Sequence, residues 1–185
     1  MAEITQTWVA NIENKKKLTL EDARFIFEQA EKFLVDVIDA HKTIIERTNT
    51  LLALLITILT GLVGFNISKI DEGFGKNNIC DTVWFLILYL ILGGIYLVKN
   101  IKPTTYMALG SQPRKIFVDH FFQKNIPDEK RVVFILSSEI ERYQTRIEEN
   151  MIINNKKWLI YRNGIYILAA IPAIFLLTYL VLVFI

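Results

Sequence analysis

Three long apolar blocks stand out along the chain, at residues 51–67, 83–98 and 165–185, and none of them contains a charged residue. A helix needs about 20 mostly apolar residues to cross a hydrocarbon core of about 30 Å. The flanking residues Asn49, Thr50 and Ser68, and Thr82 and Ile101, bring the first two blocks to that length. Because a small soluble domain rarely buries three helices that are apolar all round, the pattern predicts an all-α integral membrane protein with three transmembrane helices.

The charged segments before the first and third blocks carry apolar residues at alternating steps of three and four, the heptad pattern of packed helices. Thr19 and Asp22 have the form of a helix cap, and no Gly or Pro interrupts residues 19–60, so we expect one helix from about 20 to 68. A second long helix is expected after Pro127. We predict that these long cytoplasmic extensions pack as a bundle, seam to seam. The predicted seam comprises Ile26, Ala30, Phe33, Val37, Ala40 and Ile44 with Val133, Leu136, Ile140, Tyr143, Ile147 and Asn150 or Met151.

Six segments follow from these patterns. They are an N-terminal tail (1–18), a cytoplasmic helix continuous with the first span (19–68), an outer loop (69–81), the second span (82–101), a cytoplasmic segment with a short interfacial and a long helix (102–157), and the third span (158–185). Pro172 has no backbone N–H, so we expect it to kink the third span.

The distribution of Lys and Arg predicts the orientation. Residues 1–48 carry seven, the 69–81 loop two, and residues 99–162 twelve. Basic residues in short loops mark the cytoplasmic side, so we expect a multi-pass protein of the inner (plasma) membrane with its N-terminus inside and its C-terminus outside. Expected interfacial anchors are Lys99, Lys102, Lys156, Lys157 and Arg162, with Trp84, Trp158 and Tyr161 at the starts of spans.

Composition narrows the chemistry further. The net charge is only +2, the one cysteine, Cys80, allows no internal disulfide, and the two histidines show no metal-ligand spacing. We find no nucleophile–base pair and no phosphate-binding glycine loop, so we expect no enzyme activity, no cofactor, no metal and no nucleic acid partner. The clean spans lack ionisable residues, which argues against an ion-coupled carrier.

Small residues form a stripe along one face of the first span, at steps of three and four. The stripe consists of Thr50, Ala53, Thr57, Gly61, Gly64 and Ser68. Small residues let helices approach closely, and a weakly polar face can also line a pore in an oligomer. Gly93, Gly94, Ala169 and Ala173 offer matching small surfaces in the other two spans.

The segment between the second span and the last long helix allows two interpretations. After Pro113, the residues Phe117, Val118, Phe121 and Phe122 can form one apolar face of an interfacial helix on the inner leaflet, or of a lid packed on the long helices. Arg114 and His120 resemble the R-x(4–6)-H motif of the HEPN ribonucleases, although Lys115 stands where a small polar residue usually follows the Arg.

The layout as a whole resembles a known family over nearly the full chain. The pattern is carried by HKTIIERTN (41–49) before the first span, PTTY (103–106) and GSQP (110–113) after the second, and ERYQ (141–144) and IEEN (147–150) before the third. It is similar to the small transmembrane effectors of bacterial antiphage systems, above all the Pycsar transmembrane effector family and its CBASS-type relatives. The resemblance implies an effector that disrupts the inner membrane when a nucleotide signal reports infection.

We therefore expect an antiviral membrane effector that forms homo-oligomers and permeabilises the lipid bilayer on a cytoplasmic signal. The signal can be a nucleotide, as the resemblance implies. The chain has no recognisable cyclic-nucleotide-binding domain, so the signal can also be a soluble signalling partner. The alternative is a non-enzymatic membrane scaffold, a regulatory subunit or a CRISPR-associated accessory subunit that docks a soluble partner. A third interpretation is a membrane-bound HEPN-type ribonuclease.

Overall fold

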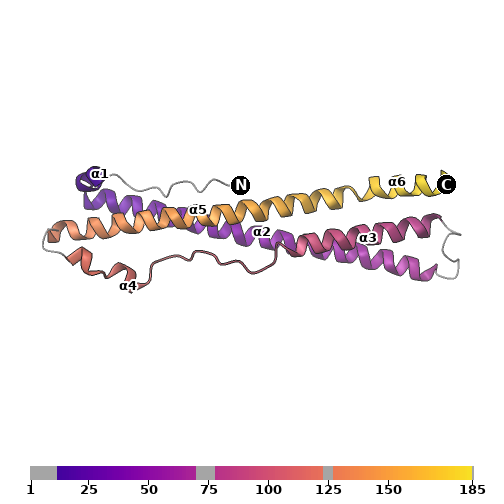
Figure 1. The fold of residues 1–185 in the computed structure, drawn as a ribbon, viewed down its shortest axis with the longest axis horizontal. Helices are drawn as coiled ribbons and strands as arrows, with labels where there is room; N and C mark the ends of the chain where they lie inside the picture. The colour runs from indigo at the N-terminus through magenta and orange to yellow at the C-terminus, as the bar shows by residue number, and fades with distance from the viewer. Residues whose placement is uncertain (1–11, 70–77, 123–126, 185) are drawn as a thin grey trace. The chain divides into compact units, whose positions relative to one another are not determined.

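The computed structural model describes residues 12–69, 78–122 and 127–184, and over this part of the chain the fold is helical without strands. This confirms the all-α prediction. The α-helices, shown in Figure 1, are α1 (Ile12–Lys17), α2 (Leu20–Ser68), α3 (Asn78–Val98), α4 (Pro113–Ile116), α5 (Asp128–Ala169) and α6 (Ile171–Phe184), with a 3₁₀ turn at Asp119–Phe122.

Two helices, α2 and α3, are long and apolar enough to cross a membrane. The pair α5 and α6 provides a third candidate if it is taken as one bent span. The α3 helix begins at Asn78, four residues earlier than predicted, so residues 78–81 belong to the helix and not to the loop. Asp81 therefore lies in the first turn of α3, where the exposed amides of a helix start favour a carboxylate.

The start of α2 is held by the predicted cap. The Thr19 hydroxyl accepts a hydrogen bond from the amide of Asp22 (3.1 Å), and the Asp22 carboxylate accepts from the hydroxyl (2.6 Å) and amide (3.2 Å) of Thr19. This reciprocal pattern satisfies amides that the first turn leaves unpaired. The hydrogen bonds from Thr19 also lower the pKa of Asp22 from its ordinary value. From this cap α2 runs for 49 residues to Ser68, as predicted.

The predicted kink is confirmed between α5 and α6, which meet at an angle of 44°. Pro172 cannot donate a hydrogen bond to the carbonyl of Leu168, and its ring would clash with that carbonyl in a straight helix. The Tyr89 hydroxyl on α3 donates to the carbonyl of Ile167 at 3.0 Å, in the last turn before the bend. The bend thus exposes a backbone acceptor that a neighbouring helix satisfies.

The chain divides into two compact units. The first contains residues 1–41 and 105–154, and the second contains residues 42–104 and 155–185. Each unit therefore takes its helices from segments far apart in the sequence, and the boundary falls inside both α2 and α5.

In the second unit, α3 packs against α2 and α6 around Leu55, Leu86, Leu90 and Leu97. Two glycines let the part of α5 in this unit approach α3 and α2 closely. A Cβ on Gly93 would lie 2.8 Å from Ile167, and a Cβ on Gly164 would lie 2.9 Å from Leu51 and still closer to Leu97. Gly93 was among the predicted small surfaces, whereas Gly164 was missed because it stands alone among larger residues.

In the first unit, α2 contacts α5 through Leu34, Val37, Tyr143 and Ile147, with Phe27, Ala30 and Ile38 packed around them. Ile26, Phe33 and Ala40 of the predicted seam are exposed instead. On α5, Val133, Ile140, Tyr143 and Ile147 are buried and Leu136 is half-buried. The contact thus uses the edge of α2 that carries Phe27 and Leu34, one residue along from Ile26 and Phe33.

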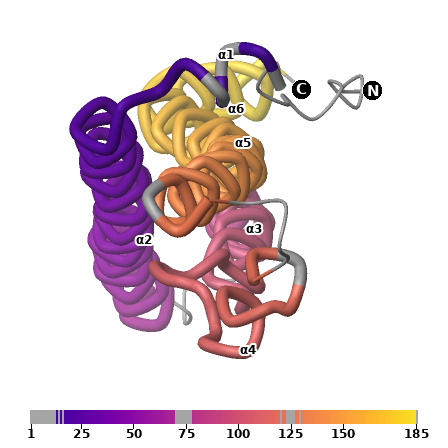
Figure 2. Tube along the Cα trace, turned by 90° about the vertical axis from the view of Figure 1, so that its left-hand side faces the viewer, coloured from indigo at the N-terminus to yellow at the C-terminus, as the bar shows by residue number. Residues whose placement is uncertain are grey.

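Between α3 and α5, the described residues 105–122 lie against α5, and no long amphipathic helix forms among them. Residues 105–112 run as an extended strap, and α4, with only four residues, follows on one side of α5 (Figures 1 and 2). Arg131 donates to the carbonyl of Phe121 (3.2 Å) and Arg142 to that of Lys115 (2.9 Å). Phe121 is buried while its three predicted face-mates are exposed, so these contacts favour the packed lid over the interfacial helix.

We predict that Gly164→Leu disrupts the second unit, because the added side chain would overlap Leu97 and Leu51. Overpacking of this kind costs about 1–3 kcal/mol, and thermal aggregation of the detergent-solubilised protein should begin at a lower temperature. Gly64→Leu is the control, since no atom lies within 4 Å of a Cβ built there. Equal onset temperatures for the two variants would contradict the close approach at Gly164.

Candidate functional site

The predicted stripe lies on the outer surface of α2. All six residues, Thr50, Ala53, Thr57, Gly61, Gly64 and Ser68, are exposed, and we call this surface the small-residue face. The hydroxyls of Thr50, Thr57 and Ser68 each donate to a carbonyl of the preceding turn, at 3.0, 2.9 and 2.7 Å. The face therefore presents short side chains, and the hydroxyl groups of these three residues already donate hydrogen bonds within α2.

The opposite side of the same stretch carries the large side chains. Leu55 is buried in the second unit, and Leu51, Leu52 and Leu62 pack around it. No atom lies within 4 Å of a Cβ built on Gly61 or Gly64. The chain therefore packs one side of α2 against its own helices. The small-residue face stays open, as do large apolar side chains such as Leu54, Ile56 and Ile67.

A polar node joins three helices of the second unit. The Thr48 hydroxyl donates to the carbonyl of Ile44 (2.8 Å) and accepts from the side-chain amide of Asn100 (2.7 Å). The ammonium group of Lys157 donates to the carbonyls of Asn100 (2.6 Å) and Lys102 (3.3 Å), just after α3 ends. The node thus links α2, α5 and the carbonyls at the C-terminal end of α3.

Lys157 was predicted as an interfacial anchor, and the structure corrects this. Its side chain is buried, and burial lowers the pKa of its ammonium group from the ordinary value. A cation beside unpaired carbonyls at a helix C-terminus is electrostatically favourable. Its neighbour Lys156 is exposed, which is the placement expected of an anchor.

Polar side chains also join the helices of the second unit at the other end of α3. The Asn66 side chain donates to the carbonyl of Cys80 at 3.3 Å, and the Asn78 side chain donates to the carbonyl of Leu182 at 3.2 Å. Cys80 itself is buried, so its thiol is not a surface group.

The strap is fixed to α5 by side-chain amides. Asn150 accepts a hydrogen bond from the amide of Met107 and donates to its carbonyl, both at 3.0 Å. Asn154 accepts from the Tyr106 hydroxyl (2.7 Å) and donates to the carbonyl of Val37 on α2 (2.8 Å). The His41 ring stacks on Tyr106 with centroids 4.3 Å apart. Burial raises the pKa of Tyr106 to about 12, so its hydroxyl remains a donor at physiological pH.

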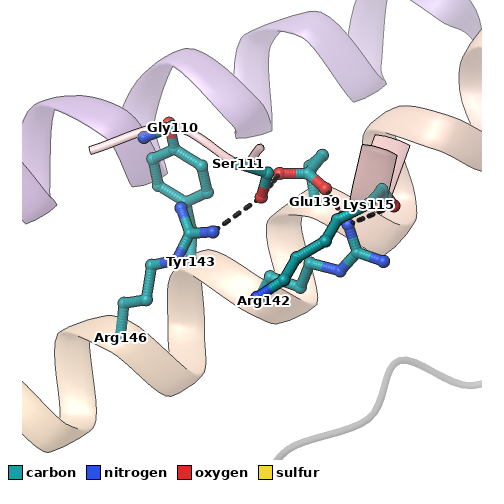
Figure 3. A network of polar contacts seen from close by, with 7 residues as sticks. All are labelled: Gly110, Ser111, Lys115, Glu139, Arg142, Tyr143 and Arg146. Atoms are coloured by element: carbon teal, nitrogen blue, oxygen red, sulfur yellow. Dashed lines mark hydrogen bonds and ion pairs between the residues drawn. The ribbon is translucent and has the colours of Figure 1, made fainter. Parts of the chain in front are cut away.

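A charged network continues this attachment toward α4. Figure 3 shows Arg142 and Arg146 of α5 beside the strap, with Ser111 next to Arg146 and Glu139 next to Arg142. Ser111 donates to Glu139 and accepts from Arg146, both at 2.6 Å. Arg142 forms an ion pair with Glu139, and the Tyr143 hydroxyl accepts from the amide of Gly110 (3.2 Å). Sequence reasoning placed Tyr143 in a seam but missed these contacts, because the heptad pattern carries no information about the strap.

The residues of the HEPN-like pair are only partly placed. Arg114 is exposed and donates to the side chain of Gln112 at 2.9 Å. The side chain of His120 lies outside the described part of the structure. Within the described residues, no three His, Cys, Asp or Glu side chains are grouped to hold a metal ion.

Comparison with protein-family profiles, with curated protein sequences and with solved structures finds no match for this chain.

We predict that Asn150→Ala loosens the strap, because it leaves the amide and carbonyl of Met107 without their partner. Met107 is exposed, so the loss corresponds to ordinary hydrogen bonds worth about 0.5–1.5 kcal/mol each. Chymotrypsin should therefore cleave after Tyr106 or Leu109 several times faster than in the native protein. Asn155→Ala is the matched control, since Asn155 is exposed. Unchanged cleavage in Asn150→Ala would contradict the role of this side chain.

Proposed function

We propose that this protein is an antiviral effector of the inner membrane, with three spans, that permeabilises the bilayer as a homo-oligomer. The observation that carries the proposal is the exposed small-residue face. Within hydrocarbon, helices associate through small residues that allow close backbone contact, since lipid supplies no hydrophobic force between them. A second α2 helix can pack closely against this face, whereas lipid chains would fill it less well.

The face supports two arrangements of the oligomer. In the first, it is a tight helix contact, and the conducting state arises when that contact rearranges. In the second, the hydroxyls and backbone of the face line a pore. Both arrangements place Gly61 at a functional surface, and both need a cytoplasmic signal, a nucleotide or a soluble partner, to set the conducting state.

The orientation is part of the proposal. The basic residues that dominate positions 1–48 and 99–162 would remain in the cytoplasm, with residues 69–81 outside. The strap and its charged network would then lie on the cytoplasmic side, where an infection signal arises.

A scaffold or regulatory subunit is the second candidate. The aromatic side chains of Phe117 and Phe122 favour it, because both are exposed and their rings stack 4.8 Å apart. Exposed aromatic residues beside basic ones are typical of protein-binding surfaces. Such a subunit would bind a soluble protein without permeabilising the membrane.

We predict that Gly61→Leu abolishes membrane permeabilisation while leaving the folded chain intact. A contact face would lose its close approach and a pore would be obstructed, whereas the single copy has open space there. Because the proposed conducting state needs an infection signal, a membrane-potential dye measures the effect in phage-infected cells that express the protein. Val181→Phe adds bulk at an exposed apolar position of α6 and should retain activity. Full activity of Gly61→Leu would count against both arrangements.

The orientation has its own test. Because Cys80 is buried, we place the reporter at Lys69, which is exposed, as Lys69→Cys in a Cys80→Ser background. A membrane-impermeant maleimide should label it on intact spheroplasts. Glu149→Cys, in the exposed part of α5, should be labelled only after lysis. The reverse result would invert the proposed topology.

A further inference from the structure

An open groove runs between α2 and α5 in the first unit, with a volume of about 530 Å³. Its walls are mostly apolar, and its polar lining consists of two amides and one carboxylate. The lining residues are Ile26, Gln29, Ala30, Phe33, Ile140, Gln144, Ile147 and Glu148. Five of them, Ile26, Ala30, Phe33, Ile140 and Ile147, belong to the predicted cytoplasmic seam, so the groove lies where the sequence indicated a helix contact.

The groove exists because α2 carries apolar residues on two neighbouring edges. The inner edge, with Phe27 and Leu34, packs against α5. The outer edge leaves Ile26 39% and Phe33 49% exposed. A helix with one neighbour needs a single apolar stripe, whereas a wider stripe is typical of a helix with two neighbours. Among the described residues, α5 packs on the inner edge and Tyr106 of the strap contacts α2 at Val37 and His41, while Ile26 and Phe33 of the outer edge stay exposed.

The spacing of the walls specifies the shape of the missing neighbour. Ile26 and Phe33 lie seven residues apart on α2, and Ile140 and Ile147 lie seven apart on α5. Seven residues correspond to about 10.5 Å of helix rise. Because Ile140 and Ile147 are themselves buried, the exposed apolar repeat is that of Ile26 and Phe33. A parallel α-helix with apolar side chains repeating every seven residues is complementary to this repeat. The Ile26–Phe33 edge of this chain is itself such a surface.

We propose that the occupant of the groove is a second copy of this chain, with the Ile26–Phe33 edge of each copy seated in the groove of the other. This inference rests on the proposed membrane topology, because copies inserted in one orientation in one bilayer hold their α2 helices parallel and at the same height. A two-fold axis then brings Phe33 of one copy beside Phe33 of the next. The contact is isologous, so it closes without leaving a second free edge.

Charge complementarity supports the same pairing. The ring contact of Phe27 with Tyr143 (5.2 Å) and the hydrogen bond of His41 with Asn154 (3.2 Å) set the relative heights of α2 and α5. Lys32 lies between these levels, opposite the turn of α5 that carries Glu148, and its side chain is exposed.

In the two-fold pair, the flank of α2 that bears Lys32 turns toward α5 of the other copy. Each Lys32 then meets Glu148 of the second copy, and the pair forms twice. The side-chain amide of Gln144 holds Glu148 in place at 2.7 Å.

Disulfide trapping tests the contact. Phe33→Cys in a Cys80→Ser background should form a disulfide-linked dimer in membranes under mild oxidation, because the two-fold axis brings the Cβ atoms within disulfide range. Glu31→Cys is the control, since it is exposed and lies about 160° away around the helix. Ile26→Cys, one heptad earlier, is a second probe should Phe33→Cys fail to accumulate. Absence of dimer with both probes, or an equal yield with Glu31→Cys, would overturn the proposal.

Charge exchange tests the register. Lys32→Glu and Glu148→Lys should each lower the Phe33→Cys dimer yield at least about tenfold, since each replaces two attractions by two repulsions and a tenfold loss corresponds to about 1.4 kcal/mol. The double variant should restore the yield. A double variant that stays as low as the single ones would overturn the Lys32–Glu148 pairing. An adduct with a different protein in place of the dimer would assign the groove to that protein and overturn the second-copy proposal.

The same cells separate this inference from the proposed function. Gly61→Leu lies outside the groove and should leave the Phe33→Cys dimer unchanged while it abolishes the dye response. If cells that express the protein with native spans form the dimer but show no dye response, the result contradicts the effector function and supports the pairing. If they show a dye response without any dimer, the result contradicts the pairing and supports the effector function.

Discussion

The packing of α5 against one edge of α2 determines what the first unit exposes. Leu34 and Val37 of α2 are buried against Tyr143 and Ile147 of α5. This choice of edge turns Phe33 outward and creates the groove. It also directs Asn150 toward the strap, because Asn150 follows Tyr143 and Ile147 on the buried side of α5. A rotation of α2 by one residue would bury Phe33 and disrupt the contact of Asn154 with Val37.

Polar side chains that bond to the backbone of another segment recur at several points of the structure. Asn150 binds both polar groups of Met107, Lys157 binds carbonyls beyond the end of α3, and Tyr89 binds the carbonyl of Ile167 before the bend. Unpaired backbone groups are costly wherever water is excluded. These side chains therefore stabilise the points at which helices end or bend.

Glycine has two distinct roles in the apolar helices. At Gly93 and Gly164, leucine and isoleucine side chains from neighbouring helices occupy the space that a side chain would take. At Gly61 and Gly64 the same absence leaves open space on the outside of α2. The packing of one chain explains Gly93 and Gly164, but it does not explain Gly61 and Gly64. We therefore propose the small-residue face, and not Gly164, as the site of assembly.

The sequence by itself determined the helical class, the bounds of α2, its cap at Thr19 and the bend at Pro172, because these depend on local chemistry and on the length of apolar runs. Only the tertiary structure decided which edge of α2 packs inward. Ala30, Val37 and Ile44 belong equally to a stripe with Ile26 and Phe33 and to one with Phe27 and Leu34, so periodicity cannot distinguish them. The strap contacts of Asn150, the burial of Lys157 and the close approach at Gly164 were likewise decided in three dimensions, since each depends on a partner at least 43 residues away in sequence.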